Sequence, residues 1–180
     1  MIAALTCAMM SLASCDKLKK DFTVKNLKFD FEAPVSGNAA TTHQAVVTRA
    51  GLDNSFTVNR TVDISEMGDP DVIEYAKKID KVSVNRTLLN ITVVPAGNYS
   101  VANVTLTAVG IAGSLVVPSY TLGGAFTPPE NMENYTAALI IKLLSTKEVT
   151  VTITGQTDAP VGTVINISYE NDLLLTASVI

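Results

Sequence analysis

The feature of this sequence that most constrains its fold is a two-residue alternation of apolar and polar side chains. It is clearest in residues 149–154, Val-Thr-Val-Thr-Ile-Thr, where aliphatic and hydroxyl side chains alternate without a break. Because successive side chains of a β-strand point to opposite faces, the pattern predicts a strand with one packed and one solvated face. The same rhythm recurs at Phe22-Val24, Leu27-Phe29-Phe31, Phe56-Val58, Val82-Val84, Ile91-Val93, Val104-Leu106 and Ile165-Ile167-Tyr169.

Segments rich in Pro, Gly, Asn and Asp separate these runs and are typical of turns. They fall at residues 34–38, 51–54, 95–98, 110–113 and 155–160. Short strands with turns at this spacing predict a mainly β fold, an antiparallel immunoglobulin-like β-sandwich. The doublet Leu88-Leu89 interrupts the alternation between Val84 and Ile91, which a β-bulge or a change of sheet would explain.

Two segments depart from the β pattern and predict short helices. The first covers about residues 70–79, where Asp69 is an expected N-cap and Pro70 takes the first helical position. The second covers about residues 128–144, with a capping-box spacing from Thr127 to Glu130 and an apolar face. A central strand over residues 137–144 is the competing interpretation, since that run is continuously apolar, but we favour the helix.

The first fourteen residues carry no charge and contain a short apolar run that ends at Leu12-Ala13-Ser14-Cys15. The run is too short to cross the roughly 30 Å hydrocarbon core of a bilayer. The motif resembles the lipobox of bacterial lipoproteins, in which a Leu and two small residues precede a cysteine that is lipidated. The resemblance implies that Cys15 is the lipid attachment site and the mature N-terminus.

This resemblance divides the chain into three parts. We expect a signal peptide over residues 1–14, a lipidated cysteine with a charged tether over residues 15–21, and one β-sandwich domain over residues 22–180. A diacylglycerol with an additional acyl chain suffices for stable membrane anchoring. The expected location is the bacterial cell envelope, with the outer membrane as the expected membrane and the N-terminal lipid as the contact to it.

Composition argues against several classes of function. The chain has 13 basic and 17 acidic residues with a net charge of −4, and without a basic patch we expect no nucleic-acid partner. His43 is the one histidine, and no serine lies in a Gly-x-Ser-x-Gly elbow, so we expect no enzyme. We expect no metal and no cofactor; the densest carboxylate group, over residues 66–74, is better explained by helix capping than by calcium.

One segment stands out as a candidate binding loop for a protein or glycan partner. It contains the aromatic and thioether side chains of Tyr120, Phe126, Met132 and Tyr135 around a Gly-Gly and a Pro-Pro pair. The alternative is that its rings close the end of the sandwich beneath the second helix.

The function expected from these features is a lipid-anchored, non-catalytic binding or structural module. A second hypothesis is a pilus subunit processed after Arg49, whose loss of one or two strands opens a groove for a neighbour's strand. A third is a carrier of an apolar ligand, which requires a cavity lined by the abundant Val, Ile and Leu residues.

Overall fold

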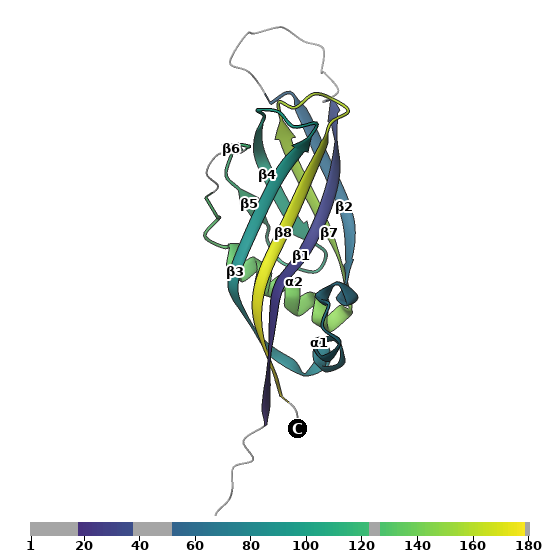
Figure 1. The fold of residues 1–180 in the computed structure, drawn as a ribbon, viewed down its shortest axis with the longest axis vertical. Helices are drawn as coiled ribbons and strands as arrows, with labels where there is room; N and C mark the ends of the chain where they lie inside the picture. Colours follow the sequence, from purple (N-terminus) through teal and green to yellow (C-terminus); the bar gives the residue numbers. More distant parts are fainter. Residues whose placement is uncertain (1–17, 38–51, 123–126, 179–180) are drawn as a thin grey trace, which may run out of the picture.

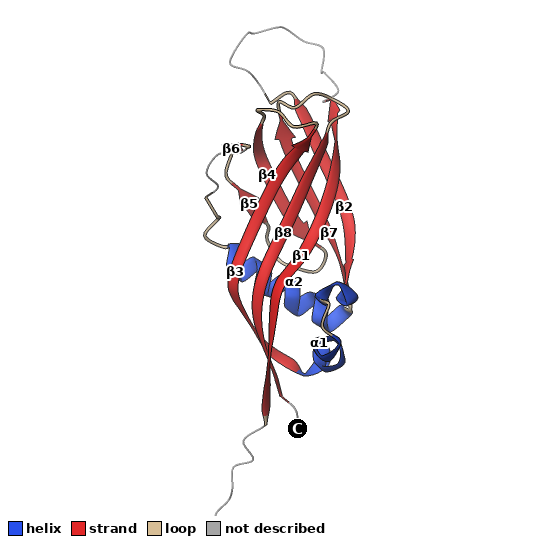
Figure 2. Ribbon diagram, in the orientation of Figure 1, coloured by secondary structure: helices blue, strands red, loops and turns tan. Residues whose placement is uncertain are grey.

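The computed structural model describes residues 18–37, 52–122 and 127–178, and these are mainly β with two short α-helices. Figure 2 shows the strands running along the long axis of the molecule, with both helices toward one end. His43 and the predicted processing site at Arg49 lie outside the described residues. So do Cys15 and Phe126.

Eight strands and four helical segments make up the described chain. The strands are β1 Lys19–Gly37, β2 Asn54–Asp63, β3 Ile79–Val94, β4 Ser100–Ala108, β5 Leu115–Val117, β6 Tyr120–Thr121, β7 Glu148–Thr157 and β8 Val164–Ser178. The helical segments are the 3-10 helix η1 Ile64–Met67, α1 Pro70–Tyr75, the 3-10 helix η2 Ala76–Lys78 and α2 Met132–Thr146.

All strand pairs are antiparallel, and the strands follow one continuous order, β3-β8-β1-β2-β7-β4-β5, with β6 also paired to β4. The long strand β1 makes this continuity possible. It pairs with β8 as far as Pro34 and then, from Val35 to Gly37, with β2. A sandwich of two separate sheets is therefore not confirmed: the strands form one curled sheet, as expected when long strands twist strongly.

The inside of this curl is filled by α2, which packs against β3 and β7. Figure 1 shows it crossing the lower half of the molecule with the β3, β8 and β1 ribbons in front of it. The buried residues of α2 recur at helical spacing and form its inner face: Met132, Tyr135, Thr136, Leu139, Ile140, Leu143 and Leu144. This confirms the helix over the competing strand, because a strand would bury every second residue instead.

The start of α2 differs from the prediction. The helix begins at Met132 after the N-cap Asn131, which makes no side-chain capping hydrogen bond, so no capping box forms between Thr127 and Glu130. A capping box does form elsewhere, at η1. The backbone N–H of Ser65 donates to Asp63 at 2.8 Å, and Glu66 accepts from the backbone of Asp63 at 3.1 Å.

The other predicted helix is present with its expected cap. The Asp69 carboxylate accepts a hydrogen bond from the backbone N–H of Asp71 at 2.9 Å, and Pro70 opens the helix. After Tyr75 the chain tightens into η2 and then enters β3 at Ile79. The predicted helix over residues 70–79 is thus a short α-helix continued by a 3-10 turn.

Both neighbours of β8 carry a bulge at the same level of the sheet. The register of β1 shifts between Val24 and Leu27, and that of β3 shifts between Val84 and Arg86. Each shift moves the inward-facing set from even-numbered to odd-numbered residues, because an extra residue reverses the faces of all that follow. The irregularity expected between Val84 and Ile91 is therefore a bulge at the start of that interval.

Asp172 of β8 holds these two bulges together. Its carboxylate accepts a hydrogen bond from the backbone N–H of Asn26 at 2.8 Å and lies 3.6 Å from the guanidinium of Arg86. Asn26 adopts a positive φ of 55°, a conformation that asparagine tolerates better than most residues. One acidic side chain thereby fixes the point where three strands bend together around α2.

Candidate functional site

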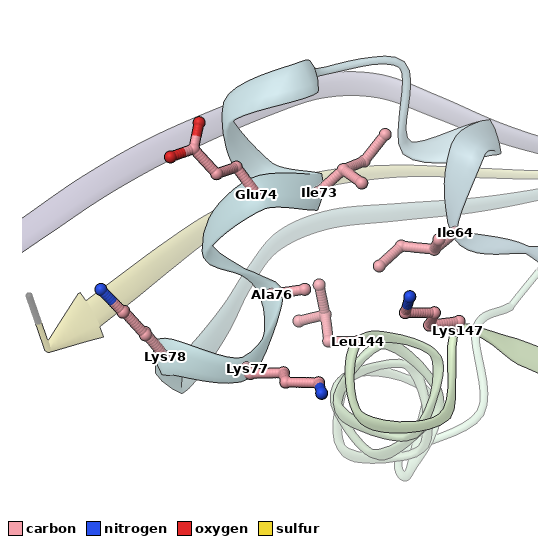
Figure 3. Close-up of a pocket in the computed structure, with 8 residues that line it drawn as sticks. All are labelled: Ile64, Ile73, Glu74, Ala76, Lys77, Lys78, Leu144 and Lys147. Atoms are coloured by element: carbon pink, nitrogen blue, oxygen red, sulfur yellow. The ribbon is translucent and has the colours of Figure 1, made fainter.

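The candidate site is a pocket at the helical end of the molecule, between η1, the α1–η2 segment and the end of α2. We call it the lysine-rimmed pocket; it has a volume of about 350 Å³ and is lined by Ile64, Ile73, Glu74, Ala76, Lys77, Lys78, Leu144 and Lys147. Figure 3 shows Ile64, Ala76 and Leu144 facing one another from the three helical segments, with the ends of Glu74 and Lys78 pointing away. The apolar side chains form a floor, and the lysines stand at its edge.

Local sequence signals place each wall of this pocket. The capping box at Asp63 turns the chain out of β2, and Gly68 ends η1 with a positive φ of 71°, which favours glycine. The cap at Asp69 then starts α1. On the opposite side, Lys147 ends α2 in the left-handed conformation with φ 71°, and its carbonyl accepts the backbone N–H of Ile64 at 2.7 Å.

The pocket lies at the end of the molecule where the described chain begins and ends. Lys19 at the start of β1 pairs with Ser178 at the end of β8, and Ile79, directly after η2, pairs with Ala177. Figure 1 shows α1 at this same end, near the mark for the C-terminus. The pocket therefore lies close to the chain segment that leads back to Cys15.

Some charged groups around the pocket have close partners and others do not. Hydrogen bonds from Ser65 lower the pKa of Asp63, and the charge of Lys147 contributes a smaller part. The Lys78 ammonium lies 5.4 Å from the centre of the Tyr75 ring. Within the described ranges, no carboxylate lies within 4.0 Å of the ammonium group of Lys147.

Three of the four carboxylates weighed as calcium ligands have separate structural partners. Glu66 pairs with Arg60 at 2.6 Å, Asp69 caps α1, and Asp71 pairs with Lys20 at 3.2 Å. In the described part of the chain, no group of three or more His, Cys, Asp or Glu side chains is arranged to hold a metal ion. These acidic residues act in capping and ion pairing.

The four residues of the candidate binding loop do not form one exposed loop among the described residues. Met132 and Tyr135 lie on the buried face of α2, with 2% and 5% of their surface exposed. Tyr120 lies in β6, where its backbone pairs with Val101. Two of the four candidates therefore contribute to the core, and Tyr135 is the one ring of the alternative interpretation that lies among the described residues.

Two buried hydroxyls connect α2 to the middle of the sheet. Thr136 donates to the backbone carbonyl of Met132 at 2.8 Å and also bonds the hydroxyl of Tyr169, so the tyrosine is the donor of the second bond. Burial raises the pKa of Tyr169 to about 12. Burial also raises the pKa of Tyr135. The neutral phenol of Tyr169 thus serves packing and hydrogen bonding, whereas the buried hydroxyl of Tyr135 has no hydrogen-bond partner among the described residues.

Sequence reasoning did not find the lysine-rimmed pocket. Its lining residues come from two regions about seventy positions apart, so no local motif joins Ile73 and Lys77 to Lys147. The one local feature that pointed to the pocket was Ile73, an apolar residue of the short helix α1. Its side chain is 38% exposed.

No helix among the described residues has both the length and the apolar character needed to cross a bilayer. No family model matches the chain, and neither the curated proteins nor the solved structures compared with it contain a match.

Proposed function

We propose that this chain is a lipid-anchored module of the bacterial cell envelope, attached to the outer membrane through Cys15, with a non-catalytic binding or structural role. The observation that carries the proposal is the position of the lipobox cysteine relative to the fold. Cys15 precedes Lys19, the first residue of β1, by four positions. Four extended residues span at most about 14 Å, so the lipid would hold this end of the domain close to the membrane.

The architecture suits such an anchor. β1 begins at the end of the molecule that carries the pocket, and it pairs along most of its length with β8 in the interior of the sheet. A force or tether applied to Lys19 therefore acts on a strand that contributes buried residues along its length, among them Phe22, Phe29 and Phe31. The remaining strands extend away from the anchored end.

A non-catalytic role is supported by what the polar groups do. At the helical end, Asp69 caps a helix and Glu66 and Asp71 pair with cations, and the buried hydroxyls of Thr136 and Tyr169 bond each other. The described surface offers an apolar pocket with a charged rim, a feature of binding rather than of bond breaking.

The pilus subunit stays a second candidate because of one observation, the internal position of β1. Cleavage after Arg49 would detach β1 from the rest of the chain, and β1 lies between β8 and β2. Its removal would leave two unpaired strand edges around a long groove that an incoming strand could fill. The inward residues Leu27, Phe29 and Phe31 would mark the positions that a donor strand must replace.

Metabolic labelling with an alkyne fatty acid, followed by fractionation, tests the anchor. We expect the unaltered protein to carry the label and to sediment with membranes, and Cys15→Ser to lose both properties. Cys7→Ser is the matched control, because Cys7 lies within the expected signal and should not carry lipid. Label on Cys15→Ser, or none on the unaltered protein, would refute the proposed anchor.

A further inference from the structure

The lysine-rimmed pocket combines an apolar floor with two cations that have no close anionic partner. In the described residues, no carboxylate lies within 4.0 Å of the ammonium groups of Lys77 and Lys147. Figure 3 shows the Lys147 ammonium between Ile64 and Leu144, and Lys77 reaching toward α2. The charged ends of Glu74 and Lys78 point to the other side in the same view.

Asp63, whose charge interacts with Lys147, also has a hydrogen-bond partner of its own. Asp63 accepts the backbone N–H of Ser65 at 2.8 Å, and this hydrogen bonding lowers its pKa. Lys147 therefore interacts with Asp63 only at longer range, and neither Lys77 nor Lys147 forms an ion pair within 4.0 Å in the described part of the chain.

The apolar part of the pocket is open to a ligand. Ile64, Ala76 and Leu144 are buried at its base, whereas Ile73 on the rim is 38% exposed. An apolar side chain left in contact with water beside an apolar floor gains free energy when a ligand covers it, at roughly 25 cal/mol per Å² of buried apolar area.

We propose that the lysine-rimmed pocket binds a free, linear alkyl carboxylate of medium chain length. The alkyl chain would cover Ile73 and the floor, and the carboxylate would lie between Lys77 and Lys147. The volume of about 350 Å³ is near the lower limit for ligand pockets. A pocket of this size suits one short alkyl chain and not a lipid with two or three acyl chains.

The C-terminal end of α2 favours a ligand with one negative charge over a ligand with two. Lys147 is the C-cap of α2, and the last carbonyl groups of a helix carry partial negative charge. This field partly offsets the two ammonium groups, so a single carboxylate fits better than a doubly charged phosphate. The negative end of the helix explains why Lys147 is favourable at this position. It does not explain Lys77, which comes from η2 and lines the same pocket.

Isothermal titration calorimetry with the full-length chain tests the assignment, with sodium octanoate as the probe and 1-octanol as the uncharged probe of equal length. We expect octanoate to bind more tightly than octanol. The double variant Lys77→Ala/Lys147→Ala should raise the Kd for octanoate roughly tenfold, as expected for two partly exposed ionic contacts, while leaving octanol unchanged. Lys142→Ala, on the same helix outside the pocket, is the matched control and should bind octanoate as the unaltered chain does.

A second pair of variants tests the apolar contact. Ile73→Ala should weaken octanoate binding, whereas Ile141→Ala, which removes an isoleucine that is 52% exposed elsewhere on α2, should not. Equal thermal unfolding of these variants and the unaltered chain excludes a loss of fold as the cause. No octanoate binding at millimolar concentration, equal affinity for octanol, or an unchanged lysine double variant would overturn the proposal. So would binding to phosphatidylglycerol vesicles without binding to free octanoate.

Discussion

The hydroxyl pair of Thr136 and Tyr169 allows a sharp test of how α2 is held inside the sheet. Both residues are fully buried, and they lie on different elements, α2 and β8. Tyr169 donates to Thr136, and Thr136 donates to the carbonyl of Met132. Removing one partner or the other therefore leaves different groups without a hydrogen bond.

The two single substitutions should differ in cost. Tyr169→Phe removes the donor, and Thr136 keeps its bond to Met132, so we expect a loss of about 1 kcal/mol. Thr136→Val leaves the Tyr169 hydroxyl buried without an acceptor, which costs about 1–3 kcal/mol. The double variant removes both polar groups, so its loss should fall short of the sum of the two by roughly 1 kcal/mol.

Urea unfolding of the full-length chain, followed by circular dichroism and by tyrosine fluorescence, measures these free energies. Coincident transitions by the two probes support a two-state analysis. Thr154→Val, an exposed hydroxyl on β7, is the control and should change the free energy of unfolding by less than about 0.5 kcal/mol. Additive losses, or a larger loss for Tyr169→Phe than for Thr136→Val, would refute the inferred direction of the hydrogen bond and the packing of α2 on β8.

Three further predictions concern single residues. Because burial raises the pKa of Tyr169 to about 12, the folded chain keeps the phenol proton above about pH 10, whereas the unfolded chain loses it. The stabilisation from this difference is complete below about pH 10 and should fall by up to about 2–3 kcal/mol by about pH 12. Urea titrations of the unaltered chain and Tyr169→Phe, run in parallel across this pH range, measure the loss. Asp172→Ala should lower the free energy of unfolding by about 1–2 kcal/mol, because it removes the acceptor for the backbone N–H of Asn26. Gly155→Ala should cost about 1–3 kcal/mol in the same assay, because its new Cβ would collide with the ring of Phe56, its cross-strand partner.

Each of these has a control in the chain. Asp30→Ala removes an acidic residue whose ion pair with Lys28 is exposed, so it should have little effect on stability. Gly37→Ala places a Cβ at an ordinary 3.5 Å from Val161 and should be tolerated. Effects of Asp172→Ala and Gly155→Ala equal to those of their controls would contradict the roles assigned to these residues, and parallel pH curves for the unaltered chain and Tyr169→Phe would contradict the raised pKa.

The mainly β fold was predictable because alternation is a local property of the sequence. The inward residues of β7 and β8 alternate as expected, and the Asp69-Pro70 signal marked a real helix start. The single curled sheet was not predictable, because an inward-facing residue has the same pattern whether it packs on a second sheet or on α2. The bulge of β3 lies in the interval where the alternation breaks, whereas the bulge of β1 was not predicted, and the contacts of both with Asp172 join positions far apart in the chain.

The candidate binding residues show a similar limit. Met132 and Tyr135 belong both to the candidate binding loop and to the apolar face predicted for the second helix, and the structure places them on the buried face of α2. Capping sequences are short and therefore ambiguous: the one at Thr127 stays unformed, while Asp63 and Glu66 form one after a strand that ends in a polar residue. Pockets built from distant segments need the tertiary structure.

Intact mass and N-terminal sequence of the protein extracted from native membranes test the proposed anchor most directly. The predicted result is a mature chain that begins at a lipidated Cys15. A mature chain that begins at Ala50 would contradict it and favour the pilus subunit, since β1 would then be separated from the domain. An unmodified chain that retains the residues before Cys15 would contradict the envelope anchor itself.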